Sequence, residues 1–350
     1  MSLIGFDIGT GNLVCAKSIR ENKSVIKSMR NMFLPISPDD LSVTEISNTQ
    51  LDYVELTESD GSLQTIAIIG EDAFRFANIF NQKVRRPMSC GIISSSELDA
   101  VDIMGHMIKF LIDETNDISN NFCVYSVPAQ PIDLTDVAPV TYHEKVFSKV
   151  FSSLGYENKP FNEGMSVVYS NCKNENYSGI GISFGAGLTN VACCYKGALA
   201  LSFSIGVAGD WIDKNVSLAT GKLQTRVTSI KEKLLDLSNV DSLKEGKKEE
   251  QRIKQSLYTF YEEMIRYVLK MISKEFNSRS DNLSVDESIP IVLSGGTSMA
   301  KGFTELFKKV FYENHEKDFP YSISEIRSAK DPLNSVAIGC LEYCLLIKSK

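Results

Sequence analysis

The stretch GFDIGTG, residues 5–11, recurs in the second half of the chain as GISFGAG, residues 181–187. Counterpart residues lie 176 positions apart, from 7 to 183, which is about half of the 350-residue chain. Apolar runs flank each copy on both sides, a pattern typical of strand, glycine turn and strand. Because the same hairpin occurs twice at this spacing, the sequence predicts two related domains with one hairpin each.

Glycine at a hairpin tip has a specific chemical use. Without a Cβ atom in the way, backbone N–H groups can approach a polyphosphate closely. Two such tips, one from each half, could clamp one nucleotide between the two domains. The copies differ at one informative position, because the second has Ser183 where the first has Asp7.

Composition narrows the class of protein. With 350 residues, of which 43% are hydrophobic, the chain can bury large cores, and two domains are expected. The net charge of −7 argues against a general nucleic-acid binder. The eight cysteines include no CxxC pair and no cluster with histidine, so buried reduced thiols in a cytoplasmic protein are expected. A strand is expected within three residues of the N-terminus, so no signal peptide is expected. No apolar run approaches the roughly 20 residues of a membrane-spanning helix, so no transmembrane segment is expected.

A third glycine turn follows a buried strand expected at 290–296. Its sequence is SGGTSMAKG, residues 294–302, where the strand meets the start of a helix, a position suited to anions or to the edge of a nucleotide. The carboxylate of Asp7, at the end of the first strand, could hold the water shell of Mg²⁺. Each turn also has a purely structural interpretation, with Asp7 capping its own turn. The Walker A and GxGxxG patterns are absent.

Between these turns the periodicity predicts further elements. Residues 31–60 are polar and indicate a small inserted subdomain or long loop, and the charged run 243–254 indicates a loop or an exposed helix face. A strand is expected at 65–70, and helices are expected at 71–79, 96–114, 141–154 and 256–276.

Together the three turns resemble the phosphate-1, phosphate-2 and adenosine motifs of the superfamily of actin, heat-shock chaperones and sugar kinases. The chain is most similar to actin and to its bacterial relatives MreB and MamK. The motifs that carry this resemblance are VLSGGTSMAKGF (292–303), SIKEKL (229–234), GEDAF (70–74), SVPAQ (126–130) and DPLNSVAIG (331–339). The resemblance spans almost the whole chain and is weakest at 18–65 and 240–290.

The resemblance implies an α/β fold with two actin-like domains, each a five-stranded mixed sheet flanked by helices. Domain I would comprise 1–155 and 331–350, with an outer subdomain at 31–65. Domain II would comprise 156–330, with an outer subdomain at 214–280. ATP or ADP and Mg²⁺ would lie in the cleft between them. The main partner would be the protein itself, in a homopolymeric filament, and an adaptor protein is a possible second partner.

The resemblance also assigns roles by position. Asp7 would hold Mg²⁺ through water, and Lys17 is near the family's phosphate lysine, although its spacing from Asp7 differs. The phosphates would be held by Gly9, Thr10, Gly11 and Asn12 on one side and by Gly185, Ala186 and Gly187 on the other. The base and ribose would be held by Gly209, Lys231, Glu232, Gly295, Gly296, Thr297 and Met299.

Hydrolysis of ATP needs an acceptor that orients the attacking water. Glu144 matches the position of this acceptor in MreB, and Gln130 is a second candidate because actin uses a glutamine in this region. Glu144 also has a structural interpretation, as an acidic first-turn residue that complements its helix dipole. Ser183 stands where the family has an aspartate that shares the Mg²⁺ water shell, and a hydroxyl supplies no charge. We therefore expect slow hydrolysis.

Two classes of function follow from this reading. The first is an ATP-dependent filament of the MreB and MamK kind. The second is a monomeric ATPase or a small-molecule kinase of the same superfamily, because a fold alone does not decide function. A kinase needs an acidic base beside a substrate pocket, and no convincing one is evident in the sequence. Sedimentation with and without ATP separates the classes.

Overall fold

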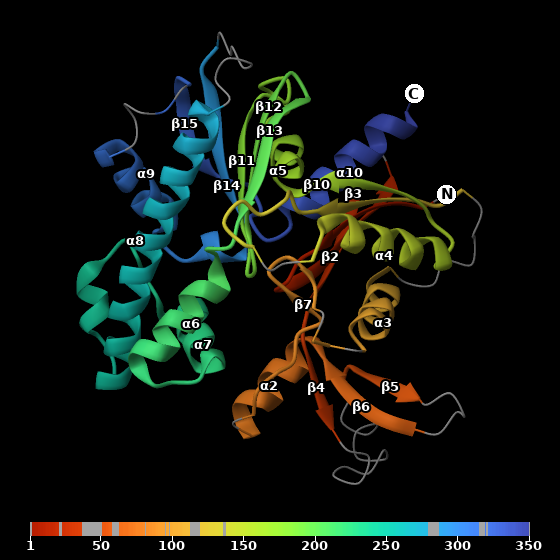
Figure 1. Cartoon of the computed structure of the whole chain (residues 1–350), viewed down its shortest axis with the longest axis horizontal. Helices are drawn as coiled ribbons and strands as arrows, with labels where there is room; N and C mark the ends of the chain where they lie inside the picture. Colours follow the sequence, from red (N-terminus) through yellow and green to blue (C-terminus); the bar gives the residue numbers. More distant parts are fainter. Residues whose placement is uncertain are drawn as a thin grey trace.

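Two five-stranded sheets form the centre of the protein (Figure 1). Three-stranded and two-stranded sheets accompany them. The computed structural model describes residues 2–20, 23–36, 51–57, 63–80, 82–94, 96–97, 99–112, 120–135, 138–278, 287–314, 319 and 321–349.

The first sheet has the strand order β10-β9-β1-β2-β3. Antiparallel pairing joins β1 to β2 and β2 to β3, whereas β9 and β10 run parallel to β1. One face is covered by α3 (Ala100–Ile112) and α4 (Val140–Ser153), whose apolar side chains share a core with β1. The strands are β1 (Leu3–Ile8), β2 (Asn12–Arg20), β3 (Lys23–Arg30), β9 (Phe122–Val127) and β10 (Glu157–Asn162).

The second sheet repeats the first, with the order β13-β12-β11-β14-β15. Its hairpin is again antiparallel, and its two later strands again run parallel to the first. The expected duplication is therefore present in the topology as well as in the sequence. The strands are β11 (Gly179–Phe184), β12 (Thr189–Tyr195), β13 (Ala198–Ile205), β14 (Ile289–Ser294) and β15 (Ile323–Ser328).

Two helices lie between the sheets and join the halves (Figure 1). They are α5 (Glu163–Asn171), which follows β10, and α10 (Ser335–Lys348), which follows β15. Their backbones are in direct contact, because a Cβ atom on Gly339 would overlap the backbone of Ser166. Val124 of the first sheet and Val292 of the second both belong to the core around these helices. This arrangement confirms the two-domain actin-like α/β fold with a five-stranded mixed sheet in each half.

Smaller elements extend each half. Beside the first sheet, β4, β5 and β6 form a three-stranded sheet with α2, and beside the second sheet lie mainly helices (Figure 1). In the first half these elements are β4 (Phe33–Ile36), β5 (Tyr53–Thr57), β6 (Leu63–Ile69), α2 (Gly70–Phe80), β7 (Met88–Ser89) and β8 (Ile92–Ile93). In the second half they are α6 (Gly209–Thr220), α7 (Gln224–Leu234), η1 (Val240–Lys244), α8 (Lys248–Asn277), η3 (Gly296–Met299) and α9 (Phe303–Asn314).

Several expected elements have different limits in the structure. The expected helix 256–276 begins earlier, at Lys248, and includes most of the charged run 243–254. The expected helix 96–114 begins at Ala100. The polar segment 31–60 contains β4 and β5, while residues 37–50 and 58–60 lie outside the described residues. Among the described residues, no helix is long and apolar enough to cross a lipid bilayer.

Candidate functional site

The two glycine hairpins face each other at the boundary between the halves. In the first, the Gly9 amide donates to the carbonyl oxygen of Asn12 at 3.1 Å. In the second, the Gly185 amide donates to the carbonyl oxygen of Leu188 at 3.0 Å. Donor and acceptor are displaced by the same 176 residues in both cases, from 9 to 185 and from 12 to 188. The two tips are therefore the same turn, built twice.

Tight approach between the tips explains their glycines. A Cβ atom on Gly187 would lie 2.6 Å from Thr10 Oγ1, and one on Gly11 would lie 2.9 Å from Ala186 Cβ. Real side chains essentially never pack at these separations, so residues larger than glycine would push the tips apart. The halves thus meet through nearly bare backbone.

The third turn is fastened to the second hairpin. Thr297 Oγ1 donates to the carbonyl oxygen of Gly185 at 2.7 Å, and the Gly209 amide donates to the same oxygen at 3.1 Å. Gly295 has φ +91° and lies against the backbone of Phe184, a conformation and a space that only glycine accepts. As a result, η3 and the start of α6 are held beside the second tip.

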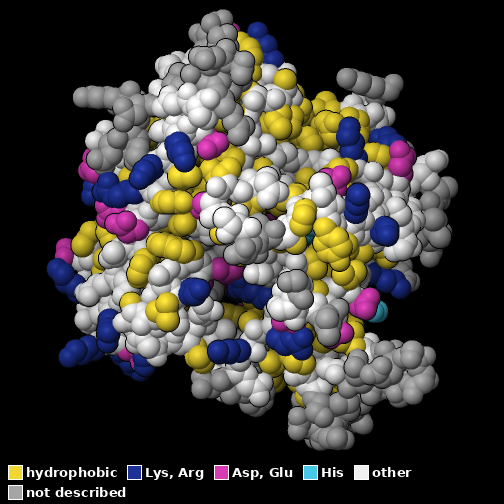
Figure 2. All heavy atoms as spheres, in the orientation of Figure 1, with side chains coloured by type: hydrophobic (Ala, Val, Ile, Leu, Met, Phe, Trp, Pro, Cys, Tyr) yellow, Lys and Arg dark blue, Asp and Glu magenta, His cyan; other side chains and the backbone are white. Residues whose placement is uncertain are grey.

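A cavity of about 760 Å³ separates the halves, and the space-filling view shows a hollow with acidic and basic side chains near the middle of this face (Figure 2). Its volume is within the range of about 300–1,000 Å³ that is usual for small-molecule sites. Most of the residues that the sequence singled out line it. They are Asp7, Gly9, Thr10, Gly11, Asn12, Ser183, Gly185, Ala186, Gly187, Gly209, Lys231, Glu232, Gly295, Gly296, Thr297 and Met299.

Asp7 is one of the residues that line this cavity. Ser126 Oγ, on β9, donates to Asp7 Oδ1 at 2.8 Å and accepts from the amide of Ile8 at 2.9 Å. Burial raises the pKa of the Asp7 carboxyl, and the bond from Ser126 opposes that rise in part. The hydroxyl therefore orients the carboxylate without supplying a counter-charge.

A second buried carboxyl, that of Glu163, is one that the sequence reasoning missed. It is the first residue of α5, it lines the cavity, and Ser183 Oγ donates to its Oε1 at 2.9 Å. Burial, and next the charge of Asp7, raise the pKa of Glu163, while bonds from Ser183 and Asn190 lower it. Its position depends on the parallel pairing of β1, β9 and β10, because the residues at the carboxyl ends of these strands share one edge of the sheet.

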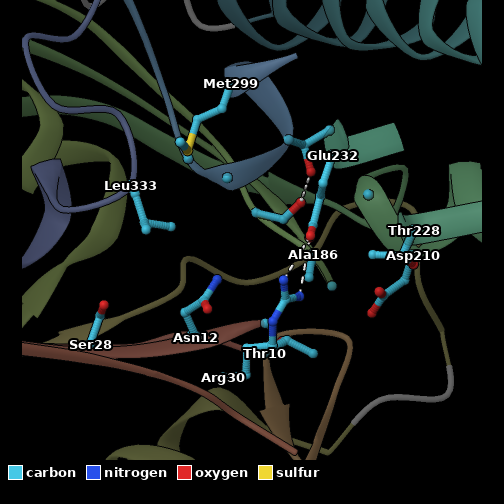
Figure 3. Close-up of a pocket in the computed structure, with 18 of the residues that line it drawn as sticks. Thr10, Asn12, Ser28, Arg30, Ala186, Asp210, Thr228, Glu232, Met299 and Leu333 are labelled. Atoms are coloured by element: carbon cyan, nitrogen blue, oxygen red, sulfur yellow. Dashed lines mark hydrogen bonds and ion pairs between the residues drawn. The ribbon is translucent and has the colours of Figure 1, made fainter. Parts of the chain in front are cut away.

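The end of the cavity beside α6 and α7 is charged. Lys231 Nζ lies 2.8 Å from Asp213 Oδ2, which also accepts from Thr228 Oγ1 at 2.7 Å. Glu232 comes down from α7 and meets Arg30, which rises from the end of β3, as the dashed lines in Figure 3 show. Met299 and Leu333 lie on the opposite side of the cavity from Thr228 and Asp210 (Figure 3). This end combines apolar walls with ionic groups, a combination suited to a base and its ribose.

Three predicted site residues lie elsewhere, since none of these described residues lines the cavity. Lys17 does not reach the cavity, because its Nζ lies 3.5 Å from the carbonyl oxygen of Ile112 at the end of α3. Gln130 has an exposed side chain beyond β9. Glu144 is the fifth residue of α4, beyond its first turn. The structure therefore brings together sixteen of the nineteen residues around the cavity, and the acid that accepts a hydrogen bond from Ser183 is Glu163.

Two similar domains with glycine hairpins across one cleft define the class of actin-like proteins. The chain belongs to the Volactin family, whose sequence model matches residues 1–343. None of the curated proteins matches this chain by sequence.

Solved structures with the same fold include a MamK double helical filament, with a TM-score of 0.68 and 16% identity over 98% of each chain. MreB 5 of Spiroplasma citri bound to AMPPNP has a TM-score of 0.66 and 16% identity over 99% of this chain and 97% of its own. The ethanolamine utilization protein EutJ from Carboxydothermus hydrogenoformans has a TM-score of 0.55 and 13% identity over 98% of this chain and 90% of its own. At these identities the likeness concerns the fold.

Proposed function

We propose that this protein binds Mg²⁺ with ATP or ADP in the interdomain cleft and assembles with copies of itself into protofilaments. The single observation that carries the nucleotide part is the pair of equivalent glycine tips, which meet each other and line one 760 Å³ cavity. The protofilament part rests on membership of an actin-like family and on similarity in fold to the MamK double helical filament. The same proposal divides the chain into domain I (1–155 and 331–350) and domain II (156–330). Their outer subdomains would be 31–65 and 214–280.

The donor set at the tips fits a triphosphate. Backbone N–H groups at residues 9–12 and 185–187 would hold the phosphates, and a Cβ at Gly11 or Gly187 would push the two tips apart. Asp7 would hold Mg²⁺ through water, and the bound cation would favour the charged form of this buried carboxyl. Lys231, Glu232 and the third turn would contact the ribose and base.

Hydrolysis would use Glu163. Its carboxylate lines the cavity beside Ser183 and near the charge of Asp7, whereas Glu144 and Gln130 lie outside the cavity. Glu163 would orient the attacking water and accept its proton. Ser183 would contribute a hydrogen bond and no charge, and we retain slow turnover as part of the proposal.

The alternative is a monomeric ATPase or a small-molecule kinase. The same fold occurs in EutJ, so the fold by itself does not separate the classes. The decisive experiment is negative-stain electron microscopy and sedimentation of the purified protein with Mg-ATP, with a non-hydrolysable analogue, and without nucleotide. Filaments that require nucleotide support the proposal. Binding of ATP without filaments under any condition would establish the monomeric alternative.

A further inference from the structure

Two ion pairs cross from one half of the protein to the other at the cavity. Arg30, the last residue of β3, donates through Nη1 to Glu232 Oε1 at 3.1 Å and through Nη2 to Oε2 at 2.7 Å. Arg86, just before β7, lies 2.6 Å from Asp210 in the first turn of α6. All four residues line the cavity. Both pairs therefore join elements that must separate when the cleft opens.

The Arg30 guanidinium is held in place before it meets Glu232. Its Nε lies 2.5 Å from Glu71 Oε2 at the start of α2, and its plane lies over the ring of Phe74 at 4.3 Å. The side chain is 20% exposed, so it is less hydrated than a typical surface arginine. Two parallel bonds to one carboxylate form the strong, geometrically specific type of arginine pair. Arg30 is thus built to hold Glu232 in one position.

We propose that the Arg30–Glu232 and Arg86–Asp210 pairs form an ionic latch that holds the cleft closed and limits the rate at which nucleotide enters and leaves. This inference rests on the proposed function, because the latch controls the nucleotide cavity. Opening must break both pairs, so that each pair adds to the barrier for release. Closure is then a property of the chain itself, and does not depend on nucleotide.

A change in ionic strength distinguishes closure by ion pairs from closure by apolar packing. Charge pairs at a partly exposed cleft weaken as ionic strength rises, whereas apolar contacts do not. We expect nucleotide release from the wild-type protein to accelerate with added salt. We expect a smaller dependence once the Arg30 pair is removed, because fewer charges remain to be screened.

The test uses the full-length chain and stopped-flow release of a fluorescent ADP analogue. Arg30→Met keeps the length of the side chain and removes its charge, and is expected to speed release about tenfold, as is typical of a strong charged pair. Arg30→Lys retains one charge without the fork and should give an intermediate rate. Lys222→Met is the matched control, because the Lys222–Glu249 pair, at 2.6 Å, lies within the second half.

A second measurement needs no nucleotide. Spin labels at Ile79→Cys on α2 and Leu218→Cys on α6, two strongly exposed positions, report the width of the cleft in a Cys90→Ser background. Arg30→Met and Arg86→Met should each broaden the distance distribution and shift it to longer values. An unchanged distribution and unchanged release rates, in variants that melt like wild type, would overturn the latch. Failure of the wild-type protein to bind the analogue would instead overturn the proposed function.

Discussion

The two glycine hairpins share a backbone and differ in their chemistry. In the first, the acid is on the hairpin as Asp7, and the hydroxyl comes from a neighbouring strand as Ser126. In the second, the hydroxyl is on the hairpin as Ser183, and the acid comes from the start of α5 as Glu163. The acid–hydroxyl pair is present twice, with the two partners exchanged. The two hairpins therefore share the same backbone turn, but the carboxyl group is on the hairpin in the first half and on a neighbouring element in the second pair.

This exchange divides the work between the halves. Both buried carboxyls come from the carboxyl-end edge of the first sheet, since Asp7 is on β1 and Glu163 follows β10. The second half supplies its glycine tip, the start of α6 and the third turn. On this comparison, loss of the acids of the first half should change hydrolysis and Mg²⁺ binding, and damage to the glycine tip of the second half should change nucleotide affinity.

The largest expected effect is on turnover in Glu163→Gln. Removing the proton acceptor should slow ATP hydrolysis about 100-fold or more, while ATP binding persists. Single-turnover phosphate release measures this effect. Glu144→Gln is the matched control and should hydrolyse ATP like wild type. If the two variants behave alike, the assignment of the acid to α5 is wrong.

Asp7→Asn should weaken the binding of Mg²⁺ more than the binding of the nucleotide itself. Since Asp7 is expected to hold the cation through water, its loss should weaken the affinity for Mg-ATP about 10- to 100-fold. Titration with and without Mg²⁺ tests this, because the affinity for free ATP should change little. Equal losses in both titrations would show that Asp7 supports the hairpin and not the cation.

Adding a side chain to the tip of the second hairpin should weaken nucleotide binding. In Gly187→Ala the new Cβ meets Thr10 Oγ1, so the tips must separate, at a cost of about 1–3 kcal/mol for overpacking. Calorimetric titration with ATP should show a loss of affinity of about tenfold, which corresponds to about 1.4 kcal/mol. Gly105→Ala, on α3, has open space around its Cβ and is the control. Unchanged affinity in Gly187→Ala would mean that the tips do not grip the phosphates.

Ser183→Asp should give the smallest effect. Restoring an acid to the second hairpin should strengthen Mg²⁺ binding and raise turnover by a few-fold. The gain is limited because the new carboxylate would lie beside Glu163, and like charges at this distance repel each other. Steady-state hydrolysis over a range of Mg²⁺ concentrations measures it. Turnover that is already fast in the wild-type protein, with no gain in the variant, would refute slow hydrolysis.

The sequence could predict the parts of the site that are local. Each glycine turn is contained within a few residues, so it can be recognised from the spacing of its glycines alone. The repeat at 176 residues predicts that the two turns lie close together. Glu163 could not be found this way, because its proximity to Asp7 depends on the parallel pairing of β1, β9 and β10. The resemblance matches Lys17 to the family's phosphate lysine, yet β2 carries Lys17 away from the tip.

The expected limits of the helices failed for a related reason. The long helix was expected to begin at residue 256 because its apolar period starts there. The preceding turns, from Lys248, are mostly charged, and Ile253 is their one apolar residue. Their helical signal is instead the acidic pair Glu249 and Glu250 in the first turn, which complements the helix dipole. Periodicity detects the buried face of a helix and misses its solvated start.

The contact between α5 and α10 has a mechanical consequence. Where Gly339 lies against the backbone of Ser166, the two helices are already as close as backbones can pack, so they can turn about this point more easily than they can slide or separate. The crossing then acts as a fulcrum, and the two sheets as arms. In Figure 1, α2 and α7 lie far from this crossing, at the outer ends of the two arms. A small force applied there has the greatest leverage over the whole cleft, and that is where Arg30 links Glu71 to Glu232.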